Sequence, residues 1–327
     1  MSFWKKKNVL VTGGAGFVGS HLVEMLVEKE AKVKVVDNLE NGVSENLASV
    51  KSKIEFAQND LKTLEGCLEA TNNIDIVMNL AAKVGGIEFN RQHPGMMFYG
   101  NVQVSANMLE AARINKVERF LVVSSACVYP RFCKIPTPES EGFVHVPEPT
   151  NEGYGWAKRM AEFQGMAYAK EFGMKIAIAR PYNAYGPRDH FNPEKSHVIP
   201  ALIKRIFEGE DPVVVWGDGE QSRAFLYVED FARGLIELTE KYPKADPVNI
   251  GTDEEIKIKD LINLIVKLSG KNPKVIFDTT KPAGQPRRNC DNAKAKEKIG
   301  FIPKINLEGG LKKTIEWYKL KNLSNIR

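Results

Sequence analysis

Tyr154 and Lys158, in the segment Tyr-Gly-Trp-Ala-Lys, are spaced so that their side chains could form an acid/base pair. Residues four positions apart on a helix lie one turn above each other on the same face. The lysine charge would favour the phenolate and lower the tyrosine pKa from its usual value of about 10. Such a base can take a proton from a sugar hydroxyl while a nicotinamide takes the hydride. A solvated helix face has the same spacing, so the interpretation depends on the rest of the chain.

A glycine-rich turn near the N-terminus predicts a dinucleotide site. Gly13, Gly16 and Gly19 follow a short apolar run and open a helical pattern. Glycines let the backbone approach a pyrophosphate, and a helix N-terminus supplies N–H donors and a positive dipole. Asp37 ends the next strand-like run, where it can accept both ribose hydroxyls of the adenosine and would repel a 2′-phosphate. The predicted cofactor is therefore NAD, with NADP less favoured.

Two further strand ends carry polar residues that fit such a site. Asp60 and Leu61 follow the third strand-like run and would lie beside the adenine, although a helix N-cap is the alternative for Asp60. Ser125 follows the run at 120–124, and ligands of open sheets bind outside the carboxyl ends of the strands. Ser125 would hydrogen-bond the reacting oxygen and complete a Ser/Tyr/Lys set.

Strand-like and helical segments alternate along the first half of the chain, which predicts a Rossmann-type, doubly wound parallel α/β sheet. The strand-like runs are 9–11, 32–36, 54–57, 74–81, 120–124 and 176–179, and the main helical patterns are 97–115 and 154–172. After about residue 181 the segments become shorter and richer in proline and glycine. We therefore expect a Rossmann domain over 1–180 and a smaller α/β substrate domain over 181–327, with segments near 213–250 returning to the first.

The composition is that of an ordinary globular protein of 327 residues with a net charge of +5. The basic residues are scattered, so nucleic-acid binding is not indicated. The four cysteines, Cys67, Cys127, Cys133 and Cys290, form neither a disulfide framework nor a metal-ligand spacing. No apolar run is long enough for a signal peptide or a membrane span. We therefore expect a cytoplasmic protein without a metal and without a membrane partner.

Several segments together resemble the extended short-chain dehydrogenase/reductases that act on nucleotide sugars. The segments are 12–20, 79–82, 124–130, 154–158 and 180–187. The resemblance covers nearly the whole chain and implies a homodimer that pairs through the helices at 97–115 and 154–172; their apolar stripes could otherwise pack only onto the sheet. It also implies the cofactor-binding residues, which are Gly13, Gly16, Phe17, Val18, Asp37, Asn38, Asp60, Leu61, Leu80, Ala81, Ala82, Tyr154, Lys158 and Tyr182.

Two branches of this family compete. Residues 81–87 and 196–202 are similar to GDP-fucose synthase, the epimerase-reductase. The segments similar to GDP-mannose 3,5-epimerase are 111–115, 124–130, 216–219 and 248–251. Both branches carry a cysteine shortly after the active serine, here Cys127, and a basic residue where His197 stands. That residue is histidine in the reductase and usually lysine in the mannose epimerase.

The chemistry of a keto sugar supports a role for Cys127 and His197. A 4-keto sugar has acidic protons at C3 and C5, and inverting either carbon needs a base on one face of the ring and an acid on the other. A thiol and an imidazole titrate close enough to neutrality to serve as both. The alternatives are a small buried Cys127 and a surface or helix-capping His197.

The resemblance also assigns residues to the substrate. Arg223 and Arg288 match positions that hold the diphosphate and ribose, as expected of arginine clamps. Asn183, Val198 and Lys204 match positions that line the nucleotide pocket, and Lys83, Gly85 and Gly86 would form a loop over the sugar. Trp216 is placed near the base, with a core aromatic as the alternative.

The leading hypothesis is an NAD-dependent epimerase of a nucleotide-diphosphate sugar, GDP-linked by resemblance, that oxidises C4 transiently and exchanges protons at C3 and/or C5. The first alternative is a GDP-4-keto-6-deoxy-hexose 3,5-epimerase-4-reductase. The second is simple C4 epimerisation or C4 oxidation. A silent, cofactor-sensing regulator would be expected to lack Tyr154 or Lys158, and both are present.

Overall fold

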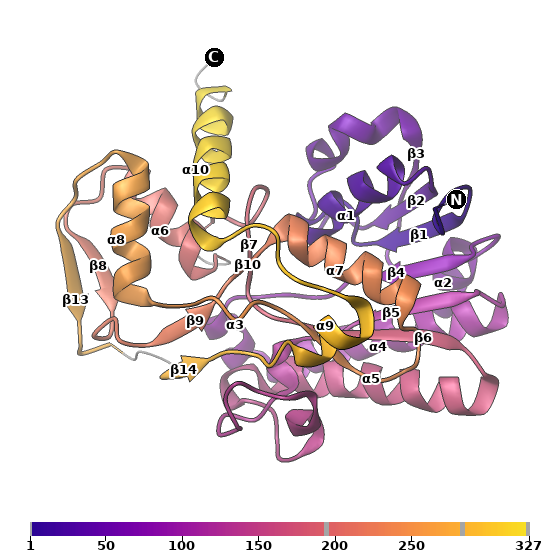
Figure 1. Cartoon of the computed structure of the whole chain (residues 1–327). Coiled ribbons are helices and arrows are strands. Elements are labelled where there is room, and N and C mark those ends of the chain that lie inside the picture. Colours follow the sequence, from indigo (N-terminus) through magenta and orange to yellow (C-terminus); the bar gives the residue numbers. More distant parts are fainter. Residues whose placement is uncertain (1, 193–195, 282–284, 325–327) are drawn as a thin grey trace.

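The computed structural model describes residues 2–192, 196–281 and 285–324 (Figure 1). Seven parallel strands form its central sheet, in the order β11-β6-β5-β4-β1-β2-β3. The strands are β1 (Asn8–Thr12), β2 (Lys32–Asp37), β3 (Ile54–Gln58), β4 (Ile76–Asn79), β5 (Arg119–Val123), β6 (Lys175–Pro181) and β11 (Val248–Ile250). The chain adds β2 and β3 on one side of β1, and β4, β5 and β6 on the other, so the strand order reverses between β1 and β4. In open parallel sheets, ligands bind at such a point, outside the carboxyl ends of the strands.

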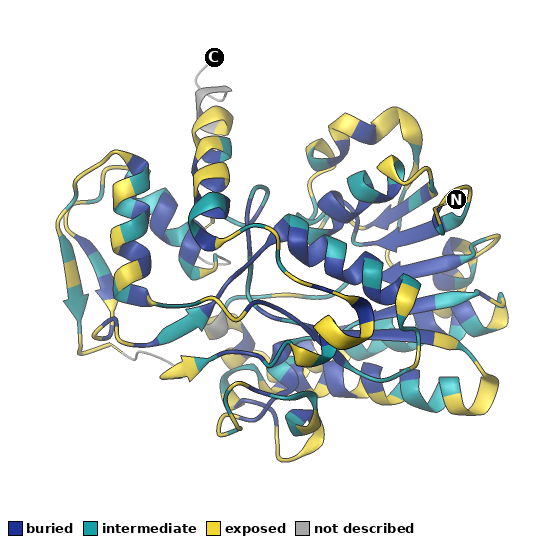
Figure 2. Cartoon of the chain, viewed as in Figure 1, coloured by how far each residue is buried: buried dark blue, intermediate teal, exposed yellow. Residues whose placement is uncertain are grey.

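The strands are apolar on both faces because helices cover both sides of the sheet. Val9 and Val11 of β1 face a core shared with α1 (Phe17–Glu28) and α7 (Val228–Lys241). Leu10, between them, faces the opposite core. The helices on that opposite side are α2 (Leu64–Ala70), α4 (Pro94–Ile114) and α5 (Glu152–Phe172). Figure 2 shows the buried residues following the strands and the sheet-facing sides of the helices. This double cover gives the near-continuous hydrophobic runs of a parallel sheet.

A second hydrophobic core lies beside the first and is built from later parts of the chain. Its helices are α6 (Val198–Phe207), α8 (Ile258–Ser269) and α10 (Leu307–Ser324). Three small sheets accompany them: β8 (Val213–Trp216) with β13 (Val275–Asp278), β7 (Ala184–Tyr185) with β10 (Leu226–Tyr227), and β12 (Glu255–Lys257), β9 (Ser222–Ala224) and β14 (Arg287–Arg288) in one sheet. The apolar face of α8 points into this core because its buried residues recur at helical spacing.

The remaining helices and 3-10 turns connect these strands and helices along the chain. They are η1 (Ser44–Lys53), α3 (Ile87–Gln92), η2 (Ala126–Val128), η3 (Glu139–Phe143), η4 (Pro149–Asn151) and α9 (Ala293–Ile299). None of the helices in the described part of the chain combines the length and the apolar character that crossing a membrane requires.

The Rossmann-type sheet predicted from the sequence is confirmed. Of the segments expected to return near 213–250, β11 joins the large sheet beside β6 and α7 covers it, whereas β8 pairs with β13 away from it. The short strands β9, β12 and β14 have no counterpart in the sequence prediction, because two or three residues carry no readable periodicity.

Candidate active site

The glycine turn between β1 and α1 has the geometry of a phosphate-binding cradle. Gly13 has a φ of +66°, which strains residues with a side chain, and a Cβ there would lie 3.0 Å from the Ala81 nitrogen. A Cβ on Gly19 would lie 2.2 Å from the Gly13 carbonyl oxygen, so only glycine lets α1 begin against the turn. The glycines therefore let the turn, the Ala81 backbone and the start of α1 pack closely together, and the helix N-terminus at this turn fits a dinucleotide pyrophosphate.

The end of β2 supplies the second part of the cofactor cradle. The Asp37 carboxylate is buried, and its two oxygens accept hydrogen bonds from the backbone N–H groups of Ala15 (2.9 Å) and Leu39 (2.8 Å). These bonds fix the side chain beside the glycine turn. A carboxylate has about four acceptor positions, so Asp37 keeps capacity for two ribose hydroxyls.

Hydrogen bonds tie together the strand ends that carry the predicted cofactor residues. Thr12 Oγ1 donates to Asn79 Oδ1 at 2.7 Å and accepts from the Ala81 N–H at 3.0 Å. Asn101, buried in α4, accepts from the Lys83 N–H at 3.0 Å and donates to the Lys83 carbonyl oxygen at the same distance. The loop that includes Leu80, Ala81 and Ala82 is therefore held in one shape.

The other predicted cofactor residues differ in their surroundings. Phe17 and Val18 lie half-buried in the first turn of α1, and Asn38 accepts a hydrogen bond from the Glu40 N–H at 3.0 Å. Leu61 and Tyr182 are buried, and Tyr182 lies against Tyr129 with 6.1 Å between ring centroids. Asp60 is exposed and forms an ion pair with Lys62 at 2.6 Å. The cap of α2 is Thr63, so the alternative of a cap at Asp60 is wrong.

Tyr154 and Lys158 lie on one face of α5, at the carboxyl end of β5. Lys158 Nζ lies 5.4 Å from the centroid of the Tyr154 ring and donates a hydrogen bond of 2.8 Å to the Val123 carbonyl oxygen. Ser125 begins the turn η2, where its hydroxyl accepts from the Cys127 N–H at 3.1 Å. The Ser/Tyr/Lys set thus surrounds the end of one strand, as the sequence predicts for this fold.

The predicted lowering of the Tyr154 pKa is wrong for the protein alone. Burial raises the pKa of Tyr154, and the nearby Cys127 adds to this. Burial also lowers the pKa of Lys158 from 10.5 to about 8, partly offset by the charges of Cys127 and Glu162. The desolvation of both groups outweighs their attraction, because each charged form loses water at this depth. A bound oxidised nicotinamide carries a positive charge that would favour the phenolate.

Glu162 is a buried charge at this site that the sequence analysis did not single out. Its carboxylate is fully buried and receives two bonds from Arg180, from Nε at 2.8 Å and from Nη2 at 2.7 Å. The Ser124 hydroxyl donates to the same carboxylate. Glu162 lies one turn after Lys158 on α5, so a charged residue repeating on the buried face was the available signal.

Cys127 lies beside an arginine that comes from far along the chain. Arg288 Nη2 lies 3.9 Å from Cys127 Sγ, and in the parallel pairing of β14 with β9 Arg288 is opposite Arg223. Burial, and then the Arg288 charge, lowers the pKa of Arg223 to about 10. Two adjacent guanidinium groups of this kind favour an anion with two charges. The neighbouring Arg287 is already bound to Glu255 at 2.8 Å.

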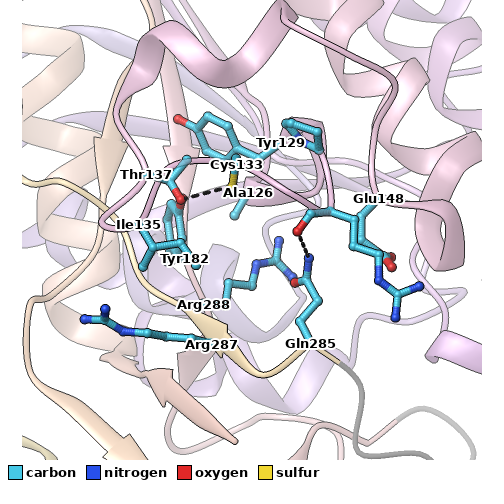
Figure 3. Close-up of a pocket in the computed structure, with 12 residues that line it drawn as sticks. Ala126, Tyr129, Cys133, Ile135, Thr137, Glu148, Tyr182, Gln285, Arg287 and Arg288 are labelled. Carbon is cyan, nitrogen blue, oxygen red and sulfur yellow. Dashed lines mark hydrogen bonds between the residues drawn. The ribbon is translucent and has the colours of Figure 1, made fainter.

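Figure 3 shows the small cavity behind this corner, with a volume of about 10 Å³, room for a single water molecule. Cys133 hydrogen-bonds Thr137 there at 3.4 Å, and Gln285 donates to the Arg131 carbonyl oxygen at 3.3 Å. Arg288 lines the same cavity as Ala126 and Tyr182. Arg288 is therefore packed against this cavity.

His197 immediately precedes α6, but its side chain makes no capping hydrogen bond, so the capping alternative is wrong. The side chain is 69% exposed, and Nδ1 lies 3.6 Å from Asp189 Oδ1. The Asp189 carboxylate raises the pKa of His197 against the opposing effect of desolvation. The ring can therefore hold a proton while it stays accessible to a ligand.

The remaining predicted substrate residues lie on several different segments of the chain. Gly85 and Gly86 lead into α3, Val198 begins α6, and Lys204 pairs with Glu208 at 3.5 Å. Lys83 Nζ lies 3.4 Å from Glu40, on the side of Asp37. The Asn183 amide donates to the Ala224 carbonyl oxygen at 2.9 Å, and Trp216 is 59% exposed, which rules out a core aromatic there. No group of His, Cys, Asp or Glu side chains within the described ranges could hold a metal ion.

Comparison with known proteins assigns the family. Residues 9–251 match the model of the NAD dependent epimerase/dehydratase family. The chain belongs to this family. Its match spans the large sheet, the glycine turn and the Tyr154–Lys158 pair, so the cofactor cradle and the acid/base pair lie within the region that defines the family.

Curated relatives of this epimerase/dehydratase share about a third of its residues over nearly its whole length. GDP-L-fucose synthase of Escherichia coli (strain K12) is 34% identical and covers 98% of this chain and 99% of its own. GDP-mannose 3,5-epimerase 1 of Oryza sativa subsp. indica is 33% identical over 97% of this chain and 83% of its own. Both branches that the sequence resembles are therefore present among its relatives.

Solved structures place the family member among nucleotide-sugar epimerases. UDP-glucose 4-epimerase of Thermotoga maritima, with UDP-glucose, has a TM-score of 0.88 at 32% identity and covers 96% of this chain and 99% of its own. UDP-glucose 4-epimerase of Thermus thermophilus, in complex with NAD, has a TM-score of 0.81 at 27% identity over 95% of this chain and 99% of its own.

Proposed function

We propose that the protein is an NAD-dependent epimerase of a GDP-hexose, which oxidises C4 transiently and exchanges protons at C3 and/or C5. The observation that carries the proposal is the approach of Arg288 to within 3.9 Å of Cys127, beside the Tyr154–Lys158 pair. An anion-binding side chain, a thiol and a hydride-transfer pair then serve one substrate. The names of the relatives, GDP-mannose 3,5-epimerase and GDP-L-fucose synthase, support the GDP-sugar class.

In this proposal, Tyr154 takes the proton of the C4 hydroxyl and Ser125 hydrogen-bonds the same oxygen. The glycine turn and Asp37 would hold NAD, which would supply the acceptor and the donor for the C4 hydride. Lys158, anchored on the Val123 carbonyl oxygen, stabilises the phenolate when a second positive charge offsets burial. Tyr154 returns the proton at the end, so the cycle has no net oxidation.

Cys127 and His197 perform the exchange at the carbons next to the keto group. One side chain removes a C–H proton, and the other delivers a proton to the opposite face of the ring. Cys127 is half-buried with the Arg288 guanidinium 3.9 Å from its sulfur, and His197 is exposed beside Asp189. A guanidinium thus lies beside the thiol and a carboxylate lies beside the imidazole, so the two groups have neighbours of opposite charge, as an acid and a base require.

We propose that the second hydrophobic core belongs to the nucleotide-sugar-binding domain, mainly within 181–327. It carries Arg223, Arg288 and Trp216 on the small strands β8, β9 and β14. The two arginines would bind the diphosphate and ribose, and the exposed Trp216 ring would lie near the base.

The preference for NAD over NADP rests on Asp37. A 2′-phosphate would lie beside the Asp37 carboxylate, which two backbone N–H groups hold in place, and the two negative charges would repel each other. Binding of NAD and NADP to the purified protein, followed by calorimetry, should differ by about tenfold or more in favour of NAD.

The reductase of the GDP-fucose synthase type is the second candidate. His197 favours it, because histidine stands at this position in that branch, whereas Asp37 opposes it because that branch usually prefers NADPH. Turnover of a 4-keto-6-deoxy sugar with a reduced cofactor would support this candidate.

We also propose a homodimer that forms through α4 and α5, in the cytoplasm. Large apolar side chains on these helices stay exposed in the monomer, among them Tyr99 (66%), Phe163 (60%) and Met160 (46%). Such a surface is typical of an interface. All four cysteines are free thiols, which fits a reducing compartment.

Incubation with GDP-mannose in D2O tests the function. Deuterium at C3 or C5 without added NADPH, read by NMR and mass spectrometry, supports epimerisation. Cys127→Ser should reduce this exchange at least about a hundredfold and leave NAD binding intact. The matched control is Cys67→Ser, because Cys67 is buried away from the crevice. Absence of exchange, together with reduction of a 4-keto-6-deoxy sugar, would overturn the proposal.

A further inference from the structure

Asp189 is a buried carboxylate with an incomplete set of partners. Its side chain is 1% exposed, and Oδ2 has no hydrogen-bond partner among the residues that the structure describes. Oδ1 accepts from the His190 N–H at 2.7 Å and lies 3.6 Å from His197 Nδ1. A buried carboxylate that lacks one partner is costly unless a positive charge lies nearby. The His197 imidazolium is the group placed to supply that charge.

Charged groups on the neighbouring elements are paired with partners other than His197, which leaves Asp189 to act on its ring. Among the described residues, Asp189 is the charged group that acts on the His197 ring. On α6 itself, Lys204 is paired with Glu208. On α1, Glu24 is paired with Arg188.

The loop that carries Asp189 is fastened to the cofactor-binding helix α1. Arg188 has a φ of +71°, and its guanidinium makes two bonds to Glu24, of 2.9 Å and 2.7 Å. His21 Nε2 lies 3.1 Å from the Pro187 carbonyl oxygen. Burial lowers the pKa of His21, so this contact is made by a neutral ring that donates its proton. The position of Asp189 is therefore set by the helix that binds the pyrophosphate.

We propose that Asp189 is a positioning residue that holds the Nδ1–H side of His197, presents Nε2 to the sugar, and stabilises the imidazolium that forms during exchange. The proposal rests on the proposed function, because it requires His197 to carry a proton to or from C3 or C5. In each inversion His197 transfers one proton to or from the ring carbon, Cys127 transfers one in the opposite sense, and exchange with water restores both groups. The arrangement is an Asp–His pair of the kind that fixes a tautomer in other acid/base sites.

The test compares Asp189→Asn with His197→Asn. NMR titration of the ring, with the signal assigned by its loss in His197→Asn among the five histidines, should show a lower midpoint in Asp189→Asn than in the unaltered protein. In Asp189→Asn the exchange rate at C3 or C5 should fall about tenfold or more. The part of its pH profile that depends on His197, identified by its loss in His197→Asn, should move to lower pH. NAD binding should not change.

The matched control is Asp230→Asn. Asp230 is a buried carboxylate on α7 that accepts from the Lys304 and Ile305 N–H groups and lies outside the crevice. It should alter the thermal midpoint without moving the His197 titration. If His197→Asn abolishes exchange but Asp189→Asn keeps both the rate and the titration midpoint, the positioning role is wrong and the proposed function stands. If exchange survives in His197→Asn, the acid/base role of His197 itself fails.

Discussion

Lys158 is 4% exposed, and its ammonium donates to the Val123 carbonyl oxygen beside the Tyr154 ring. Burial lowers its pKa from 10.5 to about 8 and raises that of Tyr154. The pair is therefore held in a state that disfavours both charges. A site of this kind lowers the stability of the folded protein because it keeps a reactive group buried.

Lys158→Met should make the cofactor-free protein more stable at pH 7, by about 2 kcal/mol. The folded-state pKa is below the unfolded-state value, so the unfolded chain binds more protons between pH 8 and 10.5. Stability of the unaltered protein therefore rises with pH through this window, and its deficit against the variant shrinks.

Urea unfolding across this pH range measures the difference. The matched control is Lys312→Met, a lysine whose side chain is 61% exposed, which should change little. Epimerase activity of Lys158→Met should fall at least about a hundredfold. A variant that is less stable at pH 7 would contradict the prediction.

At the scale of elements, glycines on α5 allow the helix to approach the turn that carries Cys127. A Cβ on Gly155 would lie 2.6 Å from the Cys127 carbonyl oxygen and 2.6 Å from Pro147 Cβ. Both contacts are closer than van der Waals distance, and one is to backbone. Gly155 follows Tyr154, so this approach sets the distance between the phenol and the thiol-bearing turn.

Gly155→Ala should push the first turn of α5 away from η2 and destabilise the protein by about 1–3 kcal/mol. Exchange at C3 and C5 should fall more than NAD binding, because the displacement separates Tyr154 from Cys127. Thermal unfolding and the D2O assay measure the two effects.

Gly165→Ala is the control on the same helix. Its Cβ would lie 3.3 Å from the side chain of Ile176, and alanine favours the helix by about 1 kcal/mol over glycine. This variant should be close to neutral. Equal behaviour of the two variants would exclude the close approach as the cause.

At the scale of the whole molecule, one buried network links the large sheet to the segment that carries Arg288. Arg180 donates to Tyr129 Oη at 3.2 Å, and that hydroxyl donates to Asn249 of β11 at 2.5 Å. Asn249 in turn donates to the Asp291 carbonyl oxygen at 3.1 Å. The network therefore joins β6 and β11 of the large sheet to the segment that follows Arg288.

At this scale, the prediction concerns the exposed apolar face of α4 and α5. Phe163→Asp and Met160→Asp should convert a dimer into a monomer, because each places a charge in the apolar centre of the proposed interface. Light scattering coupled to size-exclusion chromatography measures the mass. The control is Phe132→Asp, since Phe132 is 88% exposed on another loop. A dimeric Phe163→Asp protein would contradict the use of this face.

The sequence by itself determined the features that depend on neighbouring residues. The glycine turn, the spacing of Tyr154 and Lys158, and the alternation of strands and helices are local patterns, and they were enough to predict the fold and the family. Most of the candidate site residues follow from motifs at strand ends, where the topology of an open sheet brings ligands.

Only the tertiary structure decided how these groups are charged and paired. Arg288 contacts Cys127 although the two residues are 161 positions apart, and Arg180 of β6 binds Glu162 of α5. The direction of the Tyr154 pKa depends on burial, which no spacing of four residues reveals. Contacts between distant segments, and the desolvation that they cause, are properties of packing, and local sequence carries no signal for them.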